Sequence, residues 1–206
     1  MKFYMTPGSC STGIHILLEE LDLAFEVYPV NLLAGDHQRP EYLAINPKGT
    51  IPTLVRDDGV AITEFQAIAV WLARKHPKRG LLPTNIDDEV RVFEIMDYVI
   101  STIHMQGFAR IFTTANFAQN ENVHAQVMEK GKVIVQTGFA IVEQLLGDRD
   151  YVGTTFSIAD AALFYVEFWA TRTDIKLPPK LDAHYRRMIA RPAVARVLAE
   201  EGYRVQ

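Results

Sequence analysis

The chain of 206 residues contains a single cysteine, Cys10. One cysteine cannot form an internal disulfide or run a two-cysteine redox cycle, and such a composition suits a reducing compartment. The formal net charge is only −4, and no long run of one sign occurs. This balance argues against nucleic acid or an anionic membrane surface as the main partner.

Long apolar runs are also missing, since no stretch approaches the roughly 18 apolar residues of a membrane span. The N-terminus lacks the apolar segment of a secretory signal, and the C-terminus carries no lipidation motif. We find no internal repeat, no low-complexity segment and no pattern that indicates a metal. These absences lead us to expect a soluble, cytoplasmic protein without a metal, a membrane partner or a nucleic-acid partner.

What the sequence does contain is ample core material, since 49% of its residues are hydrophobic. Residues 2–6 read as a short strand that ends at Pro7 and Gly8, and Phe25–Leu32 reads as a second strand. Between them, apolar residues recur at the spacing of an amphipathic helix that starts near Ser11, namely Ile14, Leu17, Leu18 and Leu21. A strand, a helix and a strand in so short a stretch predict a parallel βαβ unit.

The next segment is irregular, with a short helix expected near residues 40–44. Asp58 and Gly59 lie between apolar runs, which is a strong hairpin signal. A further helix is predicted from Thr63 to just before His76. The order β-α-β, loop, β-β-α predicts a small mixed sheet with helices packed on it, followed by a linker over 76–89.

Beyond this linker no strand pattern is as clear as the helical patterns, so we predict an all-α second half. The expected helical stretches are residues 89–112, 124–146, 156–172 and 180–201, the last giving one or two helices. Gly131 and Gly138 weaken the prediction for the second of these stretches. Ser157 and Asp160 have the spacing of a capping box that starts the third. The resulting domains are residues 1–78 and residues 87–206.

Three local features of the first half bear on chemistry. Pro52 enters a strand, and a cis bond there would let the backbone of Ile51 face a ligand, although most such bonds are trans. Glu64 opens a helix, and the N-terminus of a helix attracts anions. The Glu64 carboxylate beside it would hold an amine. A plain capping role for Glu64 is the commoner case. Cys10 starts the first helix, and a helix N-terminus favours a thiolate. Alternatively, Cys10 is simply a small residue that lets the turn close.

Aromatic residues and a histidine recur at helical spacing in the second half: His104, Phe108, Phe112, Tyr165 and Trp169. Taken alone, this pattern is typical of a helical core and does not define a pocket.

Together, these pieces resemble the glutathione S-transferase superfamily, most closely its bacterial beta class, over essentially the whole chain. The segments that carry the resemblance are MKFYMTPGSCSTGIHILLEE, YLAINPKGTIPTLVRDDGVAITEFQAIAVWLA, STIHMQGFARIF and FSIADAALFYVEFWA. Their order and spacing make the match specific. The resemblance implies an α/β thioredoxin-like N-terminal domain joined to an all-α C-terminal domain, and usually a homodimer.

The resemblance also implies roles for particular residues. The bond before Pro52 is cis in the family, the backbone of Ile51 pairs with the cysteinyl part of glutathione, and Glu64 with the N–H of Phe65 holds the γ-glutamyl end. His104 and Ser101 approach glutathione from the helical domain. Phe108, Phe112, Tyr165 and Trp169 would then contribute the hydrophobic substrate pocket in the family's interdomain cleft.

Two departures from the beta-class pattern stand out. Phe65 replaces the small or hydroxylated residue usual in the family, so a hydroxyl contact is lost and a bulky ring lies near the expected ligand. The segment AGDHQRPEYLAINP resembles other classes, such as theta, in which a histidine meets the glycine carboxylate. On that basis we assign this role to His37, with Lys48 as another cation near the same end.

The implied chemistry is activation of the glutathione thiol, whose reference pKa is about 8.5. Lowering it by about two units requires about 2.7 kcal/mol in favour of the anion, which a hydrogen-bond donor and a helix N-terminus can supply. The available donors are Ser9, Cys10, Ser11 and His104. The first hypothesis is therefore a transferase that adds glutathione to a small hydrophobic electrophile, in detoxification or catabolism.

Two other hypotheses remain open from the sequence. Cys10 could form a mixed disulfide with glutathione in a thiol–disulfide or reductive enzyme. Alternatively, the chain could be a non-catalytic binding protein on the same fold, since a fold does not fix a function.

Overall fold

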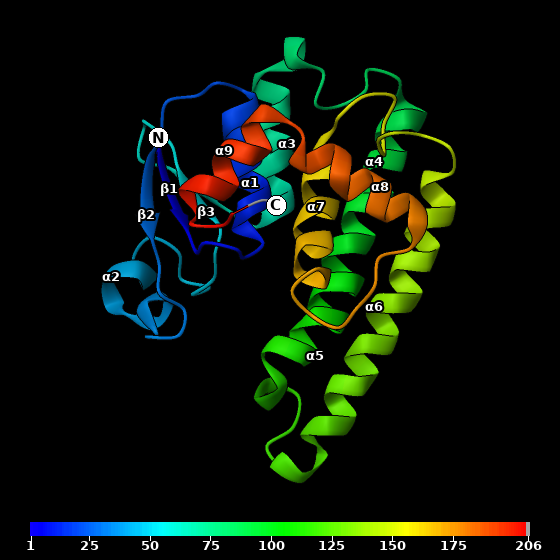
Figure 1. Ribbon diagram of the computed structural model, residues 1–206. Coiled ribbons are helices and arrows are strands. Elements are labelled where there is room, and N and C mark those ends of the chain that lie inside the picture. Colours follow the sequence, from blue (N-terminus) through cyan, green and yellow to red (C-terminus); the bar gives the residue numbers. More distant parts are fainter. Residues whose placement is uncertain (205–206) are drawn as a thin grey trace. The chain divides into compact units, whose positions relative to one another are not determined.

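The computed structural model describes residues 1–204 (Figure 1). They form two compact units. The first unit consists of Met1–Leu82 together with the segment from Met188 onward, and the second unit is Pro83–Arg187. The sequence places the division in the same linker, but it assigns the residues after 187 to the helical domain, whereas here they pack with the first unit.

The first unit is built on one mixed sheet. Within the described residues its strands are β1 (Lys2–Met5), β2 (Glu26–Pro29), β3 (Thr53–Val55) and β4 (Ala61–Thr63), in the spatial order β2-β1-β3-β4. The pair β1/β2 is parallel, and β3 is antiparallel to both β1 and β4. This confirms the predicted βαβ unit and the hairpin, and gives the thioredoxin-like topology.

The helices of the first unit are α1 (Ser11–Glu20), α2 (Pro40–Leu43), α3 (Phe65–Lys75) and α9 (Pro192–Glu200), with 3₁₀ turns η1 (Asp36–Gln38) and η2 (Pro77–Arg79). Figure 1 shows α1, α3 and α9 together on one side of the sheet. α1 contacts both α3 and α9. The predicted apolar stripe of α1 is fully buried at Ile14, Leu17 and Leu18, so burial of this face stabilises the unit.

Two boundaries in the first unit differ from the prediction. The second strand is shorter than Phe25–Leu32, because the Asn31 side chain accepts a hydrogen bond from the Ala34 N–H and turns the chain. α3 begins two residues after Thr63, because Glu64 has φ 72° and ψ 130° and cannot continue a helix.

The second unit is helical throughout its described residues. It contains α4 (Ile86–Tyr98), η3 (Val99–Phe108), α5 (Ala109–Phe112), η4 (Thr114–Asn116), η5 (Glu121–Val123), α6 (His124–Leu146) and α7 (Ile158–Ala170). α8 (Pro179–Ile189) then leads into the first unit. The segment η3 is a π-helix inserted between α4 and α5, and such wide turns are frequent at functional sites.

Close packing of α6 against η3 explains the two glycines that weakened the helix prediction. A Cβ atom on Gly138 would lie 2.6 Å from Ile103 Cγ1, and one on Gly131 would lie 2.8 Å from the Gly107 carbonyl oxygen. Real Cβ atoms do not approach other atoms so closely. The glycines therefore serve tertiary packing, and this outweighs their low helix propensity.

A buried charged cluster anchors α7 and α8 to each other. The predicted capping box is present, with Ser157 and Asp160 hydrogen-bonded across the start of α7. The ring of His184 lies between Glu167, at 2.9 Å, and Asp160, at 3.1 Å, and all three side chains are fully buried. Burial alone would lower the pKa of His184, but the two carboxylates outweigh it and raise the pKa to about 10.

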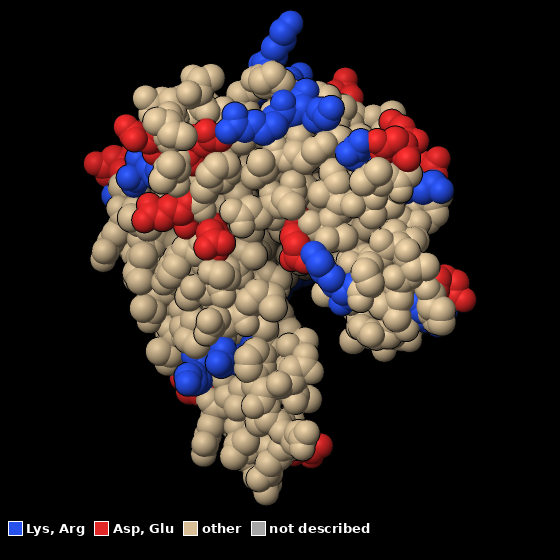
Figure 2. Space-filling view, turned by 180° about the vertical axis from the view of Figure 1, so that it is seen from behind, with Lys and Arg blue, Asp and Glu red and all other residues tan. Residues whose placement is uncertain are grey.

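The face of the molecule drawn in Figure 2 carries its charged side chains in small groups. In Figure 2, basic and acidic side chains are interspersed with large uncharged areas. None of the described helices is both long enough and apolar enough to span a membrane.

Candidate functional site

Cys10 lies at the N-cap of α1, on the turn that follows β1. Its thiol donates to the Ile51 carbonyl oxygen at 3.7 Å, which joins the first turn to the loop before β3. Burial raises the pKa of the Cys10 thiol to about 12; the N–H groups of Cys10 and Ser11 oppose this rise, and the Glu64 carboxylate adds to it. Cys10 is therefore a thiol at neutral pH.

The hydroxyls of Ser9 and Ser11 are bonded within the same turn. Each lies within hydrogen-bond distance of the Thr6 carbonyl, at 2.6 Å and 3.0 Å, and the two oxygens are 2.5 Å apart. Both hydroxyl protons are therefore used in hydrogen bonds among Ser9, Ser11 and Thr6, and Ser11 is fully buried. In this arrangement the serines shape the turn and have no proton left for a ligand sulfur.

The loop before β3 is rigidly held. The Ile51–Pro52 bond is cis, as the resemblance implies. Tyr42 donates to the Thr50 carbonyl at 2.6 Å, and the fully buried Asn46 amide donates to the same oxygen at 2.8 Å. These contacts fix the backbone on which Cys10 docks.

Tyr42 and Asn46 were missed as site residues by the sequence reasoning. A polar Asn among apolar neighbours, just before Pro47, was the available signal. Buried amides need partners, and loop carbonyls are the nearest ones.

Glu64 is the N-cap of α3, but its side chain does not cap the helix. Its Oε1 accepts a hydrogen bond from Lys48 Nζ at 2.8 Å, and Lys48 also donates to the Thr63 hydroxyl at 2.8 Å. Both charged side chains are exposed. A carboxylate and an ammonium thus lie side by side next to the N–H groups at the start of α3, and a zwitterionic amino-acid end can pair with such a set.

The ring of Phe65 is buried, with 5% of its surface exposed. It begins the buried stripe of α3 that continues through Ile68, Ala69 and Leu72. Its bulk therefore belongs to this stripe, and the backbone N–H of the first helical turn is the group that Phe65 offers to a ligand. The sequence analysis expected this ring near the ligand, whereas the structure buries it in the stripe of α3.

His37 lies in η1, beside the loop that carries Lys48. Its carbonyl oxygen approaches within 3.1 Å of the place where a Cβ on Gly49 would lie. The Nδ1 atom of His37 is buried and has no hydrogen-bond partner. The structure therefore brings His37 and the Lys48 loop into the same region of the first unit.

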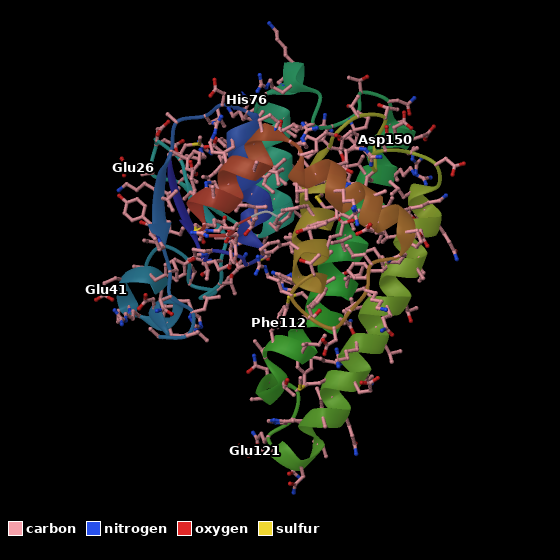
Figure 3. All side chains as sticks on the ribbon, viewed as in Figure 1. Glu26, Glu41, His76, Phe112, Glu121 and Asp150 are labelled. Atoms are coloured by element: carbon pink, nitrogen blue, oxygen red, sulfur yellow. The ribbon has the colours of Figure 1, made fainter. Side chains whose placement is uncertain are left out.

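The remaining predicted residues belong to the second unit, where most of them form one aromatic cluster. Trp169 is surrounded by His104, Tyr165, Phe108 and Phe112, with ring centroids 4.8, 5.0, 5.3 and 5.4 Å away. Phe108 and Tyr165 are fully buried, whereas Phe112 is 51% exposed at the edge of the cluster on α5 (Figure 3). The helical spacing thus gives one continuous aromatic cluster with Phe112 as its exposed member.

His104 is neutral at physiological pH. Burial lowers its pKa to about 4, and its Nδ1 lies 3.3 Å from the Tyr165 hydroxyl. It can take part in hydrogen bonds as a neutral imidazole but brings no positive charge. Ser101, one turn earlier in η3, is exposed and lies 3.5 Å from the Thr102 hydroxyl.

The fold and these groups define a class of protein: a thioredoxin-like unit with a cis-proline loop and a helix start that carries a carboxylate beside an ammonium, followed by a helical unit. Two family models match the two halves of the sequence. Residues 8–75 match the glutathione S-transferase N-terminal domain, and residues 125–200 match the glutathione S-transferase C-terminal domain.

Individual relatives resemble the chain over nearly its full length. Glutathione S-transferase GstA of Escherichia coli O157:H7 is 34% identical over 98% of this chain and 99% of that protein. A glutathione transferase homologue from Sulfitobacter, solved with bound glutathione, has a TM-score of 0.91 at 29% identity, with 97% of each chain covered. The beta-class enzyme of Sphingomonas chungbukensis has a TM-score of 0.85 at 28% identity, covering 98% of this chain and 99% of that one.

The chain belongs to the glutathione S-transferase superfamily. The sequence prediction of the family and of its two-part fold is thereby confirmed.

Proposed function

We propose that this protein binds glutathione on its first unit and adds the glutathione thiolate to a small hydrophobic electrophile. The observation that carries the proposal is the convergence of Cys10, Ile51 and the Lys48–Glu64 pair in a chain with full-length similarity to glutathione S-transferases. Glutathione carries an amino-acid end, an amide backbone and a thiol. Each of these parts has a matching group in this cluster.

The roles follow from the chemistry of each group. Glu64, with the N–H of Phe65, holds the γ-glutamyl end, while His37 and Lys48 supply positive or hydrogen-bonding groups for the glycine carboxylate. The backbone of Ile51 pairs with the cysteinyl amide. Exchange of Lys48 from Glu64 to a ligand carboxylate costs little, since an exposed ion pair is worth under about 1 kcal/mol.

The nucleophile in this proposal is the sulfur of bound glutathione, and Cys10 is a neighbour that donates a hydrogen bond. A thiol whose pKa is raised to about 12 keeps its proton at neutral pH, so it can donate a hydrogen bond and is a poor nucleophile. Its S–H, now on the Ile51 carbonyl, would turn to the glutathione sulfur and favour the thiolate there. This ranks the transferase above the thiol–disulfide enzyme that the sequence left open.

The aromatic cluster of the second unit offers the apolar surface for the electrophile, with Phe112 as its exposed edge. His104 and Ser101 are assigned as hydrogen-bonding groups of the same unit. Because His104 is neutral, we assign it a dipolar contribution only. We further expect a homodimer in the cytoplasm that acts in detoxification or catabolism, as is usual for the family; size-exclusion chromatography with light scattering measures the dimer.

Calorimetric titration with glutathione tests binding, and a panel of activated aryl halides, epoxides and enones tests conjugation. Glu64→Gln should weaken glutathione binding by about tenfold or more, because it removes the charge that pairs with the ligand amine. Glu41→Gln, at an exposed carboxylate on α2 (Figure 3), is the matched control and should bind as the wild type does.

The outcomes separate the hypotheses. Binding with conjugation supports the transferase, and binding without conjugation across the panel supports the non-catalytic binder. The transferase and the non-catalytic binder would both be rejected if glutathione, at 100 times any plausible Kd, did not raise the unfolding free energy by about 2.7 kcal/mol.

A further inference from the structure

A second group of ionisable side chains lies in the first unit, where α1 meets the end of α9. His15 and Glu19 are one helical turn apart on α1, and Glu200 is the last residue of α9. One ligand atom from each of the three lies within 4.8 Å of the other two. None of these residues has a part in the glutathione site proposed above.

His15 is held in one orientation by a buried carboxylate. Its ring is 2% exposed, and its Nδ1 lies 2.9 Å from Glu201 Oε1. Glu201 also accepts hydrogen bonds from the Gly8 N–H and the Thr12 hydroxyl, both at 2.7 Å. Because a carboxylate only accepts, the proton of a neutral His15 sits on Nδ1.

The other ring nitrogen of His15 then presents a lone pair to the cluster. Nε2 is buried without a hydrogen-bond partner, and it lies 3.3 Å from Glu200 Oε2. Two lone-pair atoms at this distance repel each other unless a proton or a metal cation lies between them. This arrangement, in which an imidazole donates one N–H to a carboxylate and directs the other nitrogen at a ligand position, is the usual environment of a metal-binding histidine.

The separation of one ligand pair matches a transition-metal ion, and the third ligand atom lies within 4.8 Å of both. Two ligands about 2.0–2.1 Å from a tetrahedral zinc ion are about 3.3–3.4 Å apart, which matches the separation of Nε2 and Glu200 Oε2. One imidazole with two carboxylates is a zinc-type donor set, because calcium and magnesium prefer oxygen ligands alone. The partly exposed Glu200 leaves a position open to solvent.

The charge balance also favours a cation. Glu19, Glu200 and Glu201 contribute three carboxylates around one imidazole. Among the described residues, Arg196 pairs with Glu19 at 2.7 Å on the solvent side, and its side chain is 58% exposed. An exposed arginine of this kind can swing away at little cost.

We propose that His15, Glu19 and Glu200 bind one zinc ion per chain, with Glu201 as the outer carboxylate that orients His15. The site fastens the end of α9 to α1. No sequence pattern indicates this site, since His15 and Glu19 form only an i, i+4 pair and the third ligand, Glu200, is far from them in the sequence.

Titration of the chelator-treated full-length protein with zinc chloride tests the proposal by calorimetry. One ion should bind per chain, and Glu19→Gln and Glu200→Gln should each weaken binding by about tenfold or more. Arg196→Ala should tighten binding about threefold, because it removes the cation that competes for Glu19. Glu121→Gln, an exposed carboxylate of the second unit (Figure 3), should bind as the wild type does.

A spectroscopic measurement separates this site from the thiol of Cys10. Cobalt bound at His15, Glu19 and Glu200 should give tetrahedral d–d bands without a thiolate charge-transfer band, and Cys10→Ala should leave the spectrum unchanged. Zinc binding that is unaffected by both Glu→Gln variants, or no binding by the wild type, would overturn the proposal.

Discussion

The reactivity of Cys10 provides a sharp test of the proposed mechanism, because the chain has no other cysteine. Burial raises the pKa of Cys10 from its ordinary value of 9.0 to about 12. This rise of three pKa units makes the thiolate form of Cys10 about 1,000-fold scarcer at neutral pH. The more basic thiolate is also the better nucleophile. With a Brønsted coefficient of about 0.4–0.5, its higher intrinsic reactivity offsets about 20-fold of the loss in reaction rate.

Cys10 should therefore attack a small chromogenic disulfide about 50-fold more slowly at pH 7 than the same cysteine does in the unfolded chain. The rate should rise about tenfold per pH unit and show no plateau below about pH 11. Stopped-flow absorbance on the native and the urea-unfolded protein gives both rates, with Cys10→Ala as the blank. A plateau below pH 9, or equal rates in the two states, would refute the reasoning.

The same variant distinguishes the two enzymatic hypotheses. Cys10→Ala should abolish mixed-disulfide formation and keep conjugation within about tenfold, because the attacking sulfur belongs to glutathione. A loss of conjugation beyond about 100-fold, or about 2.7 kcal/mol, would give Cys10 a larger catalytic role.

Three further predictions follow from local geometry. Gly8→Ala should lower the unfolding free energy by about 1–2 kcal/mol in urea titrations, since φ is +71° and a Cβ would overlap the Tyr203 hydroxyl; adding Tyr203→Phe should recover part of the loss. NMR titration should find the His104 ring neutral from pH 5.5 to 8, because burial lowers its pKa to about 4; an inflection near pH 6.5 would contradict this. The pKa of His184, raised to about 10, lies above its unfolded value of about 6.5. Its contribution to stability is thus complete below pH 6.5 and is lost as the pH rises through 10, and Asp160→Asn should flatten that decline in urea titrations at several pH values. Parallel curves for the variant and the wild type would argue against the buried ion cluster.

Much of the fold is encoded locally and was predictable. The stripe of α1, the hairpin at Asp58 and Gly59 and the capping box of α7 each depend on residues close in sequence. The π-helical segment η3 was not predictable, because a wider turn changes the phase of the apolar pattern without a signal of its own. The segment from Met188 packs with the first unit through long-range contacts, such as that between Glu201 and Thr12, which local sequence patterns do not indicate.

The candidate site was predicted mainly by resemblance, which supplied Ile51, Glu64 and Cys10 as one set. Local patterns gave only a turn, a strand entry and a helix start. The Lys48–Glu64 pair and the protonation of Cys10 arise from tertiary neighbours. Ser9 and Ser11 look like free donors in the sequence, and the structure shows them bonded to Thr6 because the turn brings that carbonyl between them.

The return of the chain to the first unit after Met188 bears on how the protein is synthesised. Gly8, Thr12 and His15 are translated before the helical unit, but their shared partner Glu201 follows that unit in the sequence. The helical unit in between is continuous in sequence and can fold while synthesis proceeds. The turn that carries Cys10 therefore acquires this support only after the helical unit has been synthesised, so that products stalled within that unit leave this turn incomplete.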